Sequence, residues 1–141
     1  MKRYALLFLA FALAGCSTSR MAVQATLPLV GSQIQAMQEE RDPVLAQKAI
    51  PANLKMLEGL LKQDPENTWI LENLAEGFCS YAFSFLEDTE PVRASSFYER
   101  GKEYALTATI IRTGREKWEG LSIEEWSHAL NNVKESHQPA L

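Results

Sequence analysis

The feature that most constrains the fold of this chain is the spacing of its apolar residues. They recur at steps of three and four from residue 21 to residue 133. Such steps place side chains on one face of an α-helix, whereas a half-buried strand needs strict alternation of apolar and polar residues. The chain has no run of alternating β-branched residues and no Asn-Gly or Asp-Gly hairpin signal. The sequence therefore predicts an all-α fold.

Prolines and capping residues divide this pattern into helices, predicted over residues 21–40, 43–63, 68–86 and 91–113 and from residue 122 onward. Asp42 before Pro43 is typical of a helix start, and Ser122 with Glu125 forms a capping box. Pro51 predicts a bend in the second helix or its division into two short helices. Because the connections are short, successive helices are expected to form antiparallel hairpins.

The third and fourth predicted helices resemble a tetratricopeptide repeat. The residues that match its two helices are Leu71, Leu74, Ala75 and Phe78, then Ala94, Tyr98 and Gly101. Small residues in this pattern let paired helices approach, so Ala94, Gly101 and Ala105 are predicted at the helix contact. More residues separate the two helix patterns than in a standard tetratricopeptide repeat. The pattern therefore predicts a degenerate tetratricopeptide-like array, and an unrelated helical bundle is the alternative.

The first residues have the features of a leader peptide. Lys2 and Arg3 precede an apolar run over residues 4–14, which is too short to span a bilayer as a helix. The four residues Leu13-Ala14-Gly15-Cys16 resemble the bacterial lipobox, in which the cysteine is acylated after cleavage. The alternative is an ordinary secretory signal that happens to contain a cysteine.

The lipobox divides the chain into a signal peptide over residues 1–15, a lipid-anchored tether over residues 16–20 and a helical domain over residues 21–141. Two or three acyl chains hold a protein stably on a membrane, where one does not. Ser17 follows the cysteine in place of aspartate, a pattern that accompanies transport to the outer membrane. The expected location is therefore the periplasmic face of that membrane.

Charge and cysteine content exclude several classes of protein. The net charge is −4, and the remainder is more acidic still once the two basic residues of the leader are removed. An acidic chain with no basic tract has no electrostatic footprint for nucleic acid. Cys79 is the only cysteine besides the lipobox Cys16, so no intrachain disulfide is expected. Cys79 lies on an apolar helical stripe and is expected to be a buried structural thiol.

No pattern in the sequence indicates catalysis. His128 and His137 are too far apart to share a helical turn, and no metal-ligand spacing accompanies them. The chain has no nucleophile elbow, no phosphate-binding loop and no dinucleotide-binding glycine pattern. We therefore expect no catalytic residue, no metal site and no cofactor. The chain is expected to be a binding protein and not an enzyme.

Four aromatic residues on the third and fourth predicted helices are candidates for a binding surface: Tyr81, Phe85, Tyr98 and Tyr104. Their spacing suits facing helices, and alanines are interleaved among them. They could line a groove for an apolar ligand. The alternative, an ordinary hairpin core, is the simpler interpretation.

The ordered combination of these patterns resembles the T-component family of TRAP transporters, the tripartite ATP-independent periplasmic systems. Over about residues 44–110 the similar segments are Ala49-Ile50-Pro51, Pro65-Glu66-Asn67, Tyr81-Ala82-Phe83 and the series Ala94, Tyr98, Gly101, Tyr104, Ala105. The resemblance implies that the chain contacts the periplasmic solute-binding protein of a TRAP transporter, with an apolar or organic-acid ligand passing between them. A structural adaptor in envelope assembly is the alternative function.

Members of that family are about twice as long and continue with further helical repeats. This chain ends where an aromatic-rich helix is expected, so residues 21–141 are interpreted as a truncated array. The last predicted helix carries an apolar face with Trp126, Ala129, Leu130 and Val133, preceded by Trp118. An uncovered apolar face favours a partner. We therefore expect self-association or pairing with a separately encoded second half.

Overall fold

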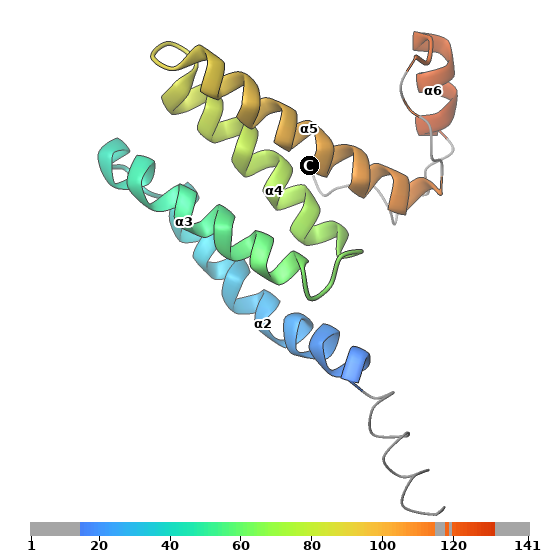
Figure 1. Ribbon diagram of the computed structural model, residues 1–141, viewed down its shortest axis with the longest axis horizontal. Coiled ribbons are helices and arrows are strands. Elements are labelled where there is room, and N and C mark those ends of the chain that lie inside the picture. The colour runs from blue at the N-terminus through green and yellow to red at the C-terminus, as the bar shows by residue number, and fades with distance from the viewer. Residues whose placement is uncertain (1–14, 115–117, 119, 132–141) are drawn as a thin grey trace, which may run out of the picture. The chain divides into compact units, whose positions relative to one another are not determined.

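A computed structural model describes residues 15–114, 118 and 120–131, and none of these residues is in a strand. The elements are α2 (Gly15–Gln38), α3 (Pro43–Leu61), α4 (Thr68–Tyr81), η1 (Ala82–Leu86), α5 (Pro91–Thr113) and α6 (Ile123–Asn131) (Figure 1). The predicted all-α class is confirmed. The tetratricopeptide-like repeat stays a prediction, and residues 1–14 of the predicted leader lie outside the described residues. The chain divides into two units, residues 1–65 and 66–141.

The first unit consists of α2 and α3, which run antiparallel beside each other (Figure 1). Val23 and Val30 of α2 are buried, as their spacing predicts. The Nε of Arg20 lies 3.5 Å from Oδ1 of Asp64, and Gln24 Nε2 donates a hydrogen bond of 3.2 Å to Oδ2 of the same carboxylate. Because Asp64 is buried just after α3, these contacts set the rotation of α2 against its neighbour. The helix begins at Gly15, so the backbone of the predicted tether is helical.

The start of α3 follows the sequence prediction. The Asp42 side chain accepts hydrogen bonds from the backbone N–H groups of Val44 and Leu45, which the first turn of a helix leaves unpaired. Pro51 lies inside α3, which is one continuous helix from Pro43 to Leu61. Of the two outcomes expected at Pro51, a bend or a division, the division into two short helices is therefore excluded. Proline lacks the backbone donor and crowds the preceding turn, so its place inside an unbroken helix departs from the usual preference.

The second unit begins with α4, whose first turn is capped by Asn67 through a hydrogen bond of 3.2 Å from the Ile70 N–H. The predicted helix over residues 68–86 changes its winding after Tyr81. The Glu87 N–H donates a hydrogen bond of 2.9 Å to the carbonyl oxygen of Ala82, five residues earlier. This bonding pattern makes η1 a π-helical turn. Phe83 in this turn is 74% exposed, so it does not contribute to the core.

The two last helices have the predicted start signals. α5 begins at Pro91 and ends at Thr113, and Gly114 follows with a φ of 67°, the left-handed conformation that closes many helices. Ser122 and Glu125 form the predicted capping box before α6, with hydrogen bonds of 3.2 and 2.8 Å. Trp118 is buried and packs on Trp126 with ring centroids 4.7 Å apart. The side chains of Ala129, Leu130 and Val133 lie outside the described residues.

Candidate functional site

The two helices of the α4–α5 hairpin approach each other closely at Gly101. A Cβ atom at this position would lie 2.4 Å from Sγ of Cys79 and 3.1 Å from the carbonyl oxygen of Ala75. Real Cβ atoms do not come within 3.0 Å of such a neighbour, so only glycine fits here without a shift. Cys79 is half-buried rather than fully buried, and its sulfur fills the space that the missing side chain leaves.

Small residues continue this line of contact along α5. Ala94 is 2% exposed and Ala108 is 3% exposed, and Gly101 lies midway between them. Ala105, which was predicted at the contact, is exposed. A step of seven residues keeps side chains on nearly the same face of a helix, whereas Ala105 is turned about 40° from Gly101. Ala108 thus occupies the place that the sequence pattern assigned to Ala105.

Five aromatic rings pack together on one side of this contact line. Phe78 of α4 lies 5.2 Å from Phe97 and 5.8 Å from Tyr104, both of α5, measured between ring centroids. Tyr81 lies 5.5 Å from Phe97 and 5.2 Å from Phe85 of the π-helical turn. We call these five residues the aromatic cluster. Phe78 and Tyr81 are buried, whereas Phe85, Phe97 and Tyr104 are half-buried, so the cluster is part core and part surface.

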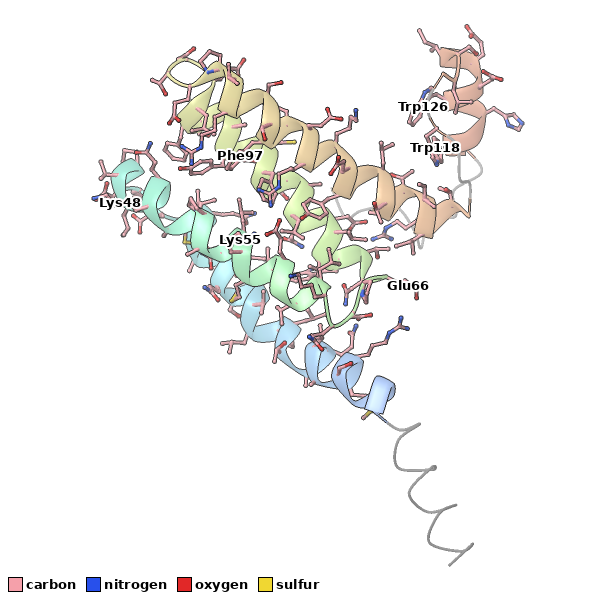
Figure 2. All side chains as sticks on the ribbon, in the orientation of Figure 1. Lys48, Lys55, Glu66, Phe97, Trp118 and Trp126 are labelled. Carbon is pink, nitrogen blue, oxygen red and sulfur yellow. The ribbon has the colours of Figure 1, made fainter. Side chains whose placement is uncertain are left out.

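Two guanidinium groups lie over the aromatic cluster. The Arg100 guanidinium carbon is 4.0 Å from the centroid of the Phe78 ring and 6.0 Å from that of Phe97. The corresponding distance from Arg93 to Phe97 is 5.5 Å, and Arg93 also pairs with Glu90 at 3.1 Å. These distances fit cation–π attraction. Figure 2 shows the Phe97 side chain beside the α4–α5 hairpin.

Tyr98 is not part of the aromatic cluster, because it projects from the other side of the contact line. Its hydroxyl donates a hydrogen bond of 2.7 Å to Oε2 of Glu87. This bond to a carboxylate raises the pKa of Tyr98 to about 12, since loss of the proton would leave two negative groups in contact. Of the four predicted aromatic residues, the structure thus groups Tyr81, Phe85 and Tyr104 and separates Tyr98 from them.

A hollow of about 430 Å³ lies beside Tyr98 at the start of α5, and its wall is formed by Glu87, Pro91, Ala94, Ser95, Tyr98, Glu99 and Lys102. Lys102 and Glu99 in this wall form an ion pair at 2.7 Å. The wall holds no pairing of a nucleophile with a histidine base. Within the part of the chain that the structure describes, no three side chains of His, Cys, Asp or Glu gather as a metal site would require.

The sequence pattern placed Phe78 in the repeat but did not connect Phe78 or Phe97 to the candidate surface. It also missed Arg93 and Arg100. A local signal was present, because Arg93, Phe97, Arg100 and Tyr104 step by four, three and four along one side of α5. Such a stripe of alternating cations and rings indicates guanidinium groups stacked on aromatic side chains.

Comparisons with known proteins give one match. The family model of the TRAP transporter T-component matches residues 39–141, which include α3, α4, the π-helical turn, α5 and α6. Searches of curated proteins and of solved structures find no significant match. The family model covers well over half of the chain and includes the aromatic cluster. This chain therefore belongs to the TRAP transporter T-component family.

Proposed function

We propose that this chain is a lipid-anchored scaffold that binds the periplasmic solute-binding protein of its TRAP transporter. The family match over residues 39–141 carries the proposal, because it associates the chain with a TRAP transport system and with a periplasmic or membrane-associated location. The family is a transporter component and not a known family of enzymes. It favours this function over a general adaptor in envelope assembly.

The aromatic cluster with Arg93 and Arg100 is the proposed contact surface. Aromatic residues and arginine are enriched at the centres of protein interfaces, where charged residues of other kinds are depleted. Phe85, Phe97 and Tyr104 keep part of their surface accessible, and Arg100 extends over the rings. A carboxylate on the partner could pair with such a guanidinium, which offers hydrogen-bond donors in a planar fork.

The same chemistry suits the proposed ligand. An organic acid combines an apolar body, which packs on aromatic rings, with a carboxylate, which pairs with a guanidinium group. We place such a ligand, or an apolar one, at the aromatic cluster when the solute-binding protein is docked. The hollow beside Tyr98 is less suitable for an acid, because its wall contains two carboxylates, Glu87 and Glu99, and a single lysine.

We propose that lipid attached to Cys16 holds the chain at the membrane. No helix among residues 15–114 and 120–131 combines the length and the apolar character needed to cross a bilayer. Residues 13–16 resemble a lipobox, and Ser17 after the cysteine favours the outer membrane. Acyl chains on Cys16 would hold the helical domain at the periplasmic face of that membrane.

A binding measurement with purified proteins tests this function. The detergent-solubilised chain is titrated with the solute-binding protein of the TRAP system encoded in the same genome. Saturable binding is expected, and a solute-binding protein of an ATP-driven importer serves as the negative control. Binding to both proteins with equal affinity would contradict the proposal, and so would the absence of binding to either one. TRAP permease genes beside the gene for this chain are the expected genomic setting.

A further inference from the structure

The outward side of α2 has an unusual composition. Buried Val23 and Val30, with the contacts of Arg20 and Gln24 to Asp64, show which side of this helix faces its neighbour. At about 100° per residue, the opposite side is formed by Met21, Ala25, Pro28, Leu29, Ser32 and Ala36. The Met21 side chain is 70% exposed and that of Leu29 is 74% exposed. None of these six residues carries a charge.

The absence of charge extends over the whole length of this segment. Residues 21–38 contain no Asp, Glu, Lys or Arg, although 23% of the chain is charged. A stretch of this length would hold about four charged residues at the average frequency, and a surface helix places them on its solvent side. The outward side of α2 is therefore not composed like a surface in contact with water alone.

The position of α2 next to the proposed lipid anchor indicates what covers this side. The helix begins at Gly15, so its backbone continues without a break from Cys16 to Met21. At a rise of about 1.5 Å per residue, Met21 lies about 8 Å and Leu29 about 20 Å along the axis from Cys16. A helix joined so closely to acyl chains can place its uncharged side against the lipid surface.

The charge of the chain also supports lipid as the partner of the outward side of α2. The chain is acidic overall, with a net charge of −4, and anionic lipid head groups repel acidic surfaces. An uncharged side can approach the bilayer without that repulsion. Surface-seeking helices usually add lysine or arginine to their apolar face. Because residues 21–38 have neither, this side needs the acyl chains to bring it to the membrane.

We propose that α2 lies along the periplasmic surface of the membrane, with Met21, Ala25 and Leu29 in contact with lipid. The inference rests on the proposed anchoring at Cys16. It goes beyond the family assignment, because α2 ends at Gln38 and the matched region begins at residue 39. Lying flat, α2 would fix the orientation of the α2–α3 unit toward the membrane, which a flexible tether would not.

Site-specific photo-crosslinking tests the contact in the full-length, membrane-bound protein. A benzophenone amino acid replaces Leu29 in one variant and Gln38 in another. Both positions are exposed, and they differ by about 180° around α2, so Gln38 is the matched control. After irradiation in vesicles of phosphatidylethanolamine and phosphatidylglycerol, the intact mass of the chain reports lipid adducts. Adducts are expected at position 29 and none at position 38.

The outcomes separate this inference from the function on which it rests. An acylated chain without lipid adducts at position 29 would overturn the inference and leave the anchor intact. A product of doubled mass at position 29 would assign this side of α2 to a second copy of the chain and overturn the lipid contact. A chain without acyl mass would overturn the anchor first, and the membrane-lying helix with it.

Discussion

Gly101 and Gly59 are a matched pair of helical glycines with opposite surroundings. A Cβ at Gly101 would meet Cys79 and Ala75, whereas a Cβ at Gly59 would meet nothing within 4 Å. Gly101→Ala is expected to lower the free energy of unfolding by about 1–3 kcal/mol, the usual cost of overpacking. Gly59→Ala is expected to raise it by about 0.5–1 kcal/mol, since alanine favours the helix.

Urea denaturation followed by circular dichroism measures both changes. Cys79→Ala should recover much of the loss in Gly101→Ala, because it removes the sulfur atom that the new methyl group would meet. If Gly101→Ala proves as stable as the wild type, the close approach of α4 and α5 at this residue is contradicted.

The ionisation of Tyr98 is the second prediction at this scale. The hydrogen bond to Glu87 raises the pKa of Tyr98 to about 12, from a usual value near 10. A raised pKa means that the bond contributes its full stability below about pH 10 and loses it as the pH rises toward about 12. Chemical shifts of ring-labelled tyrosine should show this titration. In Glu87→Gln the pKa should return toward its usual value, and an unchanged pKa there would exclude Glu87 as the cause.

Single-residue features were the most predictable from sequence. The cap at Asp42 and the capping box of Ser122 and Glu125 follow from local hydrogen bonding. The requirement for glycine at position 101 follows from a repeat pattern. Ala105 could not be placed by that pattern, because a turn of about 40° around the helix separates an exposed position from a buried one.

At the scale of elements, the Asp42 cap predicts how α3 responds to mutation. Its carboxylate accepts hydrogen bonds of 2.8 and 3.3 Å from Val44 and Leu45. Asp42→Ala is expected to cost about 1 kcal/mol of unfolding free energy, and Asp42→Asn much less, because the amide oxygen also accepts. Thermal and urea unfolding of the three proteins checks the order. Equal stability of Asp42→Ala and Asp42→Asn would show that the cap does not stabilise α3.

The π-helical turn after α4 could not be predicted from sequence. The extra residue in its turn is accommodated because Ala82 and Leu86 are both buried, at 0% and 1% exposure, while Phe83 and Ser84 face outward. The composition of residues 82–86 does not indicate whether their N–H groups bond to the carbonyl four residues back or to the one five residues back. Tertiary packing, which overrides local propensity, decides between the two.

At the scale of the whole molecule, the family could be inferred from the order of weak motifs after a lipobox, and the family model agrees. The contact surface could not be inferred in full. Three of the four proposed aromatic residues join the aromatic cluster, Phe78 and Phe97 complete it, and Tyr98 lies elsewhere. Spacing along one helix does not show on which side of the contact line a residue lies.

Anchoring at Cys16 is the first prediction at this scale. In a Gram-negative host the wild-type chain should be cleaved before Cys16, carry acyl mass and sediment with the outer membrane. Cys16→Ser should lose both the acyl mass and the membrane retention, because the thiol that takes the lipid is absent. Intact mass and membrane fractionation check this. A wild-type product that is soluble and unmodified would contradict it.

The contact between this chain and its solute-binding protein is the central claim. Arg100 and Lys102 both belong to α5 and lie about 100° to either side of Gly101, so their replacement by alanine removes the same charge from opposite sides of the helix. Of these two residues, Arg100 lies over the aromatic cluster and Lys102 does not. Both variants are first compared with the wild type by thermal unfolding.

The dissociation constant for the solute-binding protein of the same TRAP system is then the deciding measurement. Arg100→Ala is expected to weaken binding about tenfold or more, which corresponds to about 1.4 kcal/mol, whereas Lys102→Ala should leave the affinity nearly unchanged. Equal affinities for the wild type and both variants, or a larger loss in Lys102→Ala, would contradict a partner site at the aromatic cluster.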